Sequence, residues 1–199
     1  ILAADESTGT IAKRFNGINV ENTEINRLAF REALFKSEAI KNYIGGIILF
    51  DETIRQKTSS GLSVPELIVK NGSIPGIKVD KGAKVLSGSP EETITEGLDG
   101  LRDRLKEYYK LGARFTKWRA VIKIANNCPT VQCIKSNSHA LARYAALVQE
   151  CNMVPIVEPE VLMDGSHDID KCYNVTQNVL NDCYEQLVLH KVNLKGTVL

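Results

Sequence analysis

The stretch FTKWRAVIKI, residues 115–124, alternates charged and apolar side chains within a β-branched and aromatic run. This composition is typical of a buried strand. Side chains two residues apart on a strand share a face, so Lys117 and Arg119 are expected to point the same way. Burying both charges against a layer of helices would carry a large free-energy penalty. We therefore expect them to face the inside of a sheet or barrel, with Phe115 and Trp118 on or near the helix layer.

Charged side chains also lie at the ends of other apolar runs, either as a pair two residues apart or as a single residue. The charges at strand ends are Asp5, Lys78, Asp80, Lys117, Arg119, Glu158 and Glu160. Because the carboxyl ends of parallel strands meet at one mouth of a barrel, we predict that these side chains converge on one cavity. The alternative is a solvated loop rim, or internal ion pairs that only stabilise the fold.

Six short apolar runs alternate with amphipathic segments along the chain. They occupy residues 1–4, 44–50, 74–79, 115–124, 154–157 and 192–199. Continuous Ile- and Val-rich runs suit strands buried on both faces, and the intervals leave room for helical crossovers. A repeated βα pattern fits a (β/α)8 TIM barrel or an open doubly wound sheet. We predict an incomplete barrel, with about the first six βα units in a single domain over residues 1–199.

Four longer helices are expected between these runs, at residues 21–43, 91–111, 138–151 and 168–190. The second begins at what looks like a capping box, in which Ser89 is followed by Pro90 and Glu92. The stretch 58–64 is expected to be a loop within the domain.

Composition excludes several classes of protein. The 199 residues carry 25 basic and 24 acidic side chains, a net charge of +1, so no general nucleic-acid or membrane-surface field is expected. The five Cys show no metal-type spacing and are read as reduced thiols of a cytoplasmic protein. The three His are scattered, and no glycine-rich dinucleotide fingerprint follows a strand, so neither a metal nor a cofactor is expected.

The charges themselves suggest a chemistry. A lysine close to another cation loses its proton more readily and can act as a nucleophile or base. Neighbouring carboxylates can serve as general acid and base. The pattern therefore favours metal-free carbonyl or sugar chemistry. Lys13 and Arg14, which follow Thr10 near a helix start, either hold a phosphate or form a solvated basic turn.

Six segments together resemble class I fructose-1,6-bisphosphate aldolase, in order along the whole chain. They are ILAADESTGTIAKR (1–14), ENTEINR (21–27), IGGIILFDET (44–53), GIKVDKG (76–82), FTKWRAVIKI (115–124) and PIVEPE (155–160). The resemblance implies a (β/α)8 barrel, a cytoplasmic lyase of glycolysis and gluconeogenesis, and a homotetramer. It implies reversible cleavage of fructose 1,6-bisphosphate to dihydroxyacetone phosphate and glyceraldehyde 3-phosphate, through a lysine Schiff base on the sixth strand.

The resemblance also implies catalytic roles. Asp5 would handle the C4 hydroxyl proton, and Glu158 would act as acid and base in forming and hydrolysing the Schiff base. Lys117 would lower the pKa of the Schiff-base lysine and contact the substrate, with support from Glu160. The implied substrate-binding residues are Thr10, Lys13, Arg14, Arg27, Lys78 and Arg119.

Two features depart from the family pattern. The chain starts and stops within apolar runs, so we expect a fragment of a longer protein whose Schiff-base lysine would be residue 200, directly after Leu199. Lys195 stands where the family usually has Glu. We expect the fragment alone to be inactive, and poorly stable or aggregating because two strand edges would be exposed.

Two other functions remain open from the sequence. One is a different Schiff-base barrel enzyme, similar to transaldolase or deoxyribose-phosphate aldolase. The other is a non-catalytic scaffold that binds cytoskeletal filaments or partner proteins through the barrel surface.

Overall fold

A computed structural model describes residues 1–199, and the chain divides into two compact units. The first comprises residues 1–78 and 107–116, and the second comprises residues 79–106 and 117–199. Each unit contains its own parallel strands and helices. The expected single domain over residues 1–199 stays a prediction.

The first unit is built on three parallel strands, β1 (Leu2–Ala4), β2 (Gly46–Leu49) and β3 (Ile74–Lys78). Their hydrogen-bonded order is β1-β2-β3. All four residues of β2 are buried, as the continuous apolar run predicted for a strand covered on both faces. This confirms strands at the first three apolar runs.

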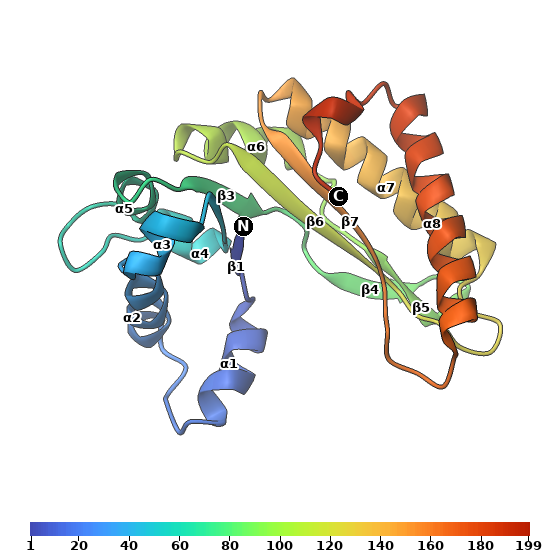
Figure 1. Cartoon of the computed structure of the whole chain (residues 1–199), viewed down its shortest axis with the longest axis horizontal. Helices are drawn as coiled ribbons and strands as arrows, with labels where there is room; N and C mark the ends of the chain where they lie inside the picture. Colours follow the sequence, from blue (N-terminus) through green and yellow to red (C-terminus); the bar gives the residue numbers. More distant parts are fainter. The chain divides into compact units, whose positions relative to one another are not determined.

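Five helices belong to the first unit and follow its strands (Figure 1). They are α1 (Thr8–Asn16), α2 (Glu24–Phe35), α3 (Glu38–Tyr43), α4 (Asp51–Arg55) and α5 (Val64–Lys70). The single helix predicted over 21–43 is wrong, because Ser37 interrupts it and caps α3 by accepting a hydrogen bond from the Ala39 amide. The loop predicted at 58–64 is confirmed up to Ser63, whose side chain caps α5.

The second unit contains a hairpin, two strands and two long helices. Its elements are β4 (Ala83–Leu86), β5 (Ser89–Thr95), β6 (Phe115–Ile122, from Lys117 onward), α7 (Val131–Glu150), β7 (Val154–Val161), α8 (Ile169–Leu189) and the 3₁₀ helix η1 (Leu194–Gly196). Helix α6 (Leu101–Lys110) starts in this unit and ends in the first. Figure 1 shows α7 and α8 packed side by side.

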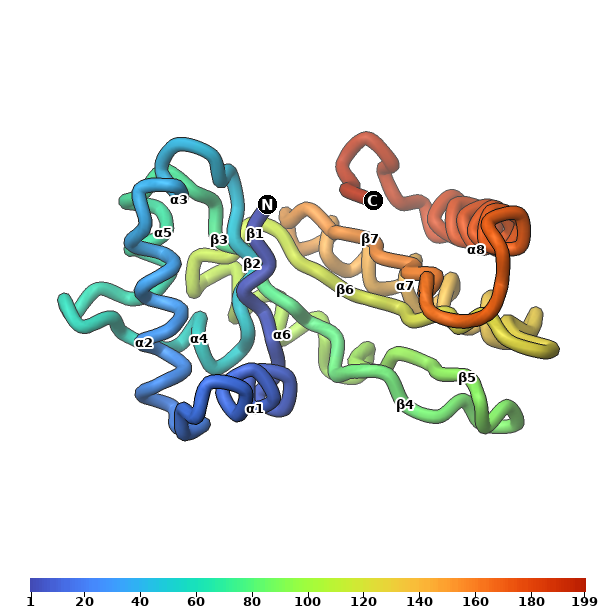
Figure 2. The backbone as a smooth tube through the Cα atoms, turned by 60° about the horizontal axis from the view of Figure 1, so that its bottom comes forward, coloured from blue at the N-terminus to red at the C-terminus, as the bar shows by residue number.

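The helix predicted over 91–111 is wrong in its first half. Residues 83–95 form the antiparallel hairpin β4–β5, seen in Figure 2, and the helix begins only at Leu101. The Ser89 hydroxyl donates to the Glu92 carboxylate at 2.7 Å, which is a contact between side chains and not the pair of side-chain-to-amide bonds that defines a capping box. However, Glu92 also accepts a 2.7 Å hydrogen bond from the Thr130 amide, at the start of α7. This distant partner holds the segment extended, together with its β-branched residues.

Two other boundaries differ from the prediction. Helix α7 begins seven positions before the predicted Ser138, because the Thr130 hydroxyl caps it by accepting from the Cys133 amide at 3.1 Å. The predicted strand over 192–199 is wrong: residues 194–196 form a 3₁₀ helix, and the parallel pairing is an isolated bridge between Val198 and Ile156. The helix predicted over 168–190 is confirmed, with Asp168 as its N-cap.

Alternation along β6 sorts its side chains onto two faces. Trp118, Ala120 and Ile122 are buried, whereas Lys117 and Arg119 are only partly covered. Trp118 packs on Tyr144 of α7, with ring centroids 5.4 Å apart. Placing Phe115 with Trp118 was wrong: by alternation Phe115 lies on the Lys117 face, and its ring fits against Gly76.

No helix of the protein combines the length and the apolar character that crossing a membrane requires.

Candidate active site

Four charged side chains of the second unit form one cluster on β6 and β7. Lys117 Nζ lies 3.4 Å from Oε2 of Glu158, and Arg119 Nε lies 3.9 Å from Oε1 of the same carboxylate. Arg119 also forms a hydrogen-bonded ion pair with Glu160. Alternation places each pair on one face of its strand, so two strands present two cations to two carboxylates.

Burial makes the Lys117–Glu158 pair unlike a surface ion pair, whereas Arg119 and Glu160 are more exposed. The side chains of Lys117 and Glu158 are 14% and 31% exposed. Burial raises the pKa of Glu158, an effect that the nearby charge of Lys117 opposes. A carboxyl group with a raised pKa holds its proton at higher pH than an ordinary glutamate, as a general acid requires.

Asp80 joins this cluster in the second unit. Its Oδ1 accepts from the Gly82 amide at 3.0 Å, and its Oδ2 accepts from the Arg119 amide at 3.4 Å. Five of the seven charges predicted at strand ends therefore gather in one unit. Asp5 and Lys78 belong to the first unit, where Asp5 is 7% exposed and Lys78 is half-buried.

The residues expected beside a phosphate lie on α1, which follows β1 and Asp5. The Ser7 hydroxyl caps α1 and lies 3.0 Å from the Thr10 hydroxyl. Lys13 and Arg14 are exposed one turn further on, and Arg14 forms an ion pair with Glu6. The N-terminus of α1 therefore offers hydroxyl groups and a favourable dipole to an anion, whereas Lys13 and Arg14 lie in the last turn of this helix and not near its start, as the sequence had suggested.

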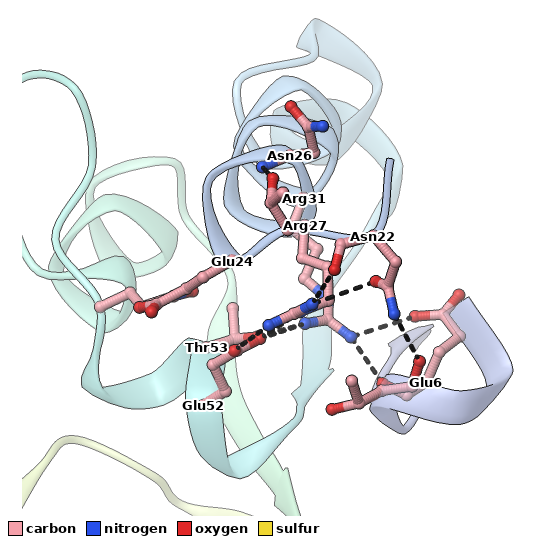
Figure 3. A network of polar contacts seen from close by, with 11 residues as sticks. Glu6, Asn22, Glu24, Asn26, Arg27, Arg31, Glu52 and Thr53 are labelled. Atoms are coloured by element: carbon pink, nitrogen blue, oxygen red, sulfur yellow. Dashed lines mark hydrogen bonds and ion pairs between the residues drawn. The ribbon is translucent and has the colours of Figure 1, made fainter. Parts of the chain in front are cut away.

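Arg27 on α2 is fully engaged within the protein (Figure 3). Its Nε and Nη2 donate to the two oxygens of Glu52 at 2.8 and 2.6 Å, and its Nη1 donates to the carbonyl and side-chain oxygens of Asn22 at 3.0 Å. The hydrogen-bonded Glu52 carboxylate raises the pKa of Arg27, and Arg27 lowers that of Glu52. A ligand phosphate at Arg27 would have to compete with this bidentate pair.

The residues that sequence reasoning missed are the partners of these groups. Glu6, Arg31 and Glu52 appear in the same network in Figure 3, and Arg31 is completely buried. A signal for two of them was present: Asp5-Glu6 and Asp51-Glu52 are Asp-Glu pairs that follow the adjacent strands β1 and β2. Nothing local in the sequence marked Arg31.

Parallel βα units whose strand ends carry acids beside an amine define an α/β protein equipped for proton transfer. The family model "Glycolytic: Fructose-bisphosphate aldolase class-I" matches residues 1–199. The chain belongs to the class I fructose-bisphosphate aldolase family.

Similar proteins agree with this assignment. The chain is 59% identical over all 199 residues to a probable fructose-bisphosphate aldolase class 1 of Xanthomonas campestris, covering 60% of it. It is equally identical to the cytosolic fructose-bisphosphate aldolase 4 of Arabidopsis thaliana, covering 51%. The solved aldolase of Plasmodium falciparum, in complex with TRAP and a small-molecule inhibitor, matches 98% of this chain with a TM-score of 0.96 and 48% identity.

These matches confirm the predicted fold, an incomplete (β/α)8 barrel. The solved aldolase is matched over 57% of its own chain. The chain spans about half to three fifths of the length of the curated relatives, from 51% to 60%.

Proposed function

We propose that the complete protein carrying this chain is a class I fructose-1,6-bisphosphate aldolase. It cleaves fructose 1,6-bisphosphate reversibly into dihydroxyacetone phosphate and glyceraldehyde 3-phosphate. The observation that carries the proposal is the Lys117–Glu158 pair on β6 and β7, in a chain that belongs to this family over its whole length.

Glu158 supplies and removes protons while the imine forms. A lysine amine, at position 200 in the family pattern, attacks the C2 ketone of the substrate and forms a carbinolamine. Glu158 donates a proton to the departing hydroxyl, which leaves as water. Its raised pKa supports this role, since a protonated carboxyl is needed. The positive charge of Lys117 favours the neutral, nucleophilic form of the neighbouring amine.

Asp5 acts in the carbon–carbon cleavage. Its carboxylate takes the proton of the C4 hydroxyl, the C3–C4 bond breaks, and its electron pair moves into the protonated imine to give an enamine. Glyceraldehyde 3-phosphate leaves, the enamine is protonated at C3, and hydrolysis releases dihydroxyacetone phosphate. Asp5 follows β1 directly and is largely buried, which suits a base shielded from water.

Substrate phosphates bind through basic and hydroxyl groups. We assign phosphate binding to Lys13, Arg14 and Arg27, with Thr10 beside them. Lys78 and Arg119 are assigned to substrate binding at the mouth of the barrel. Arg14 and Arg27 form ion pairs with Glu6 and Glu52, and Arg119 forms one with Glu160. The Glu160 carboxylate orients Arg119 and raises its pKa, so it supports the cluster indirectly.

We also propose that the complete protein is a cytoplasmic homotetramer. Relatives described as cytosolic support the location. The Plasmodium aldolase complex with TRAP shows that a member of the family binds another protein, which makes filament-type partners worth testing here. The oligomeric state is measured by light scattering of the complete protein.

Borohydride reduction tests the proposed reaction. The complete protein, incubated with dihydroxyacetone phosphate and borohydride, is expected to gain a covalent label on one lysine and to lose cleavage activity. Labelling by another ketose or aldehyde, with no labelling by dihydroxyacetone phosphate, would favour a different Schiff-base barrel enzyme. A folded protein that neither labels nor cleaves fructose 1,6-bisphosphate would refute the proposal and favour a scaffold.

A further inference from the structure

The guanidinium group of Arg31 joins two segments that follow adjacent parallel strands. Nη2 donates to the main-chain carbonyl of Glu6 at 2.6 Å, and Nη1 donates to the Thr53 hydroxyl at 2.7 Å. Glu6 comes one residue after Asp5 at the end of β1, and Thr53 lies in α4, which follows β2. Figure 3 shows the group between these two segments.

Arg31 is buried without any exposed surface, and two carboxylates compensate its charge. Its Nη2 lies 3.7 Å from Glu6 Oε2, and its Nη1 lies 3.9 Å from Glu52 Oε2. The Phe50 ring covers it, with the centroid 5.9 Å away. A buried cation is costly unless geometry and hydrogen bonds are favourable. Only a planar, multi-donor guanidinium can serve both sides at once.

We propose that Arg31 is a positioning residue for Asp5: by holding the Glu6 carbonyl it fixes the short segment between β1 and α1 that carries the Asp5 carboxylate. The inference rests on the proposed function, in which Asp5 accepts the C4 hydroxyl proton. The contact holds the carbonyl of the residue that follows Asp5, so its loss frees the backbone segment next to Asp5 and with it the position of that side chain. A displacement of about 1 Å at a reacting group can cost roughly 100-fold in rate.

The competing interpretation is that Arg31 only stabilises the fold. Loss of stability alone would reduce the fraction of active protein and lower every partial reaction equally. If Arg31 positions Asp5, its loss should instead affect cleavage of fructose 1,6-bisphosphate more than imine formation. Imine formation with dihydroxyacetone phosphate needs the Schiff-base lysine and Glu158 but no C4 hydroxyl. Cleavage of fructose 1,6-bisphosphate needs Asp5 as well.

The test uses the complete protein with Arg31→Lys, Asp5→Asn and the double variant. For Arg31→Lys we expect kcat for cleavage to fall about 10- to 100-fold, with borohydride trapping of dihydroxyacetone phosphate within about twofold of wild type. In the double variant, Arg31→Lys should cause no further loss of kcat beyond that of Asp5→Asn, because the effects of residues that act as a unit are not additive. Arg55→Lys, a change at an exposed arginine of α4, is the matched control and should leave both reactions unchanged.

Equal losses in trapping and cleavage, or an additive loss in the double variant, would overturn the inference. If Arg31→Lys does not fold, Thr53→Val takes its place, since it removes the Nη1 acceptor with little change of shape. It should lower cleavage by about 2- to 5-fold and spare trapping, and equal losses would again count against positioning. Wild-type protein that neither traps nor cleaves would refute the proposed function itself, and the inference would fall with it.

Discussion

Lys117 Nζ on β6 lies 3.4 Å from Glu158 Oε2 on β7, and both side chains are largely shielded from solvent. In this position the carboxyl group experiences two opposing influences. Burial raises its pKa, and the ammonium charge lowers it. Because burial is the larger effect, Glu158 keeps its proton above the range of an exposed glutamate. The same pair therefore contains a charged amine and a carboxyl suited to proton donation.

Replacing Glu158 by Gln removes the proton donor while keeping the shape of the side chain. We expect imine formation with dihydroxyacetone phosphate to slow by about 10²- to 10⁴-fold, measured by borohydride trapping at timed intervals. Glu185→Gln, at an exposed position on α8, is the control and should react like wild type. An unchanged trapping rate in Glu158→Gln would remove this residue from the proposed mechanism.

The titration of Glu158 depends on Lys117. In Lys117→Met the ammonium charge that lowers the pKa is gone, so the pKa of Glu158 should rise above its wild-type value. Carbon-13 NMR of the labelled carboxyl groups measures both values, with Glu158→Gln to assign the resonance. A lower pKa in Lys117→Met would contradict the pairing.

The raised pKa also fixes the sign of a stability effect. A carboxyl group with a raised folded-state pKa contributes stability that is fully present below its unfolded-state pKa and is lost as pH rises through the folded-state pKa. Glu158 should therefore contribute less to the free energy of unfolding at neutral pH than at a low pH where it is protonated in both states. The comparison of wild type with Glu158→Gln in urea at several pH values measures this difference.

Arg27 and Arg14 should differ in their importance for stability. Arg27 is 8% exposed and forms a bidentate pair with Glu52, so Arg27→Ala removes both of these hydrogen bonds from a partly buried carboxylate and leaves it only the more distant Arg31. We expect a loss of about 2–4 kcal/mol in the free energy of unfolding. Arg14 is 60% exposed, so Arg14→Ala should cost at most about 1 kcal/mol. Equal effects in urea unfolding would show that the Arg27 pair contributes little.

Gly76 in β3 has no room for a side chain. A Cβ atom there would lie 2.3 Å from the Phe115 ring. Gly76→Ala should therefore destabilise the protein by about 1–3 kcal/mol. Adding Phe115→Leu to this variant, which makes the neighbouring side chain smaller, should restore part of the lost stability. Gly9→Ala is the control, because nothing lies within 4 Å of the added atom. Unchanged thermal unfolding of Gly76→Ala would show that the ring moves aside at no cost.

Glu32 should make folding sensitive to acid. Hydrogen bonds from Lys36 and Ser59 lower its pKa from 4.5 to about 2. A carboxylate whose pKa is lower in the folded state stabilises the fold at any pH above its unfolded-state pKa. This contribution is lost as the pH falls through the folded-state pKa, here between pH 4.5 and about 2. Since Lys36 is half exposed, we expect a contribution of only about 1 kcal/mol. Glu32→Gln should unfold with a shallower pH dependence in that window.

Much of the strand pattern could be read from the sequence because it is periodic. Alternation in residues 115–122 predicted that Lys117 and Arg119 share a face, and the burial of every second residue agrees. The hairpin at residues 83–95 could not be read in this way. The signal at Ser89 and Glu92 is the same in a helix cap and in a strand, and only the distant Thr130 amide decides between them.

The amino-acid sequence by itself determined the positions of five parallel strands, the charges at their ends and membership of the aldolase family, since these depend on local patterns and ordered motifs. Only the tertiary structure decided which charge meets which. Arg31 and Glu6 are separated by 25 positions, and their bond exists because the fold brings Arg31 of α2 to the segment that follows β1. Such a partnership follows from packing in three dimensions, and no spacing along the chain encodes it.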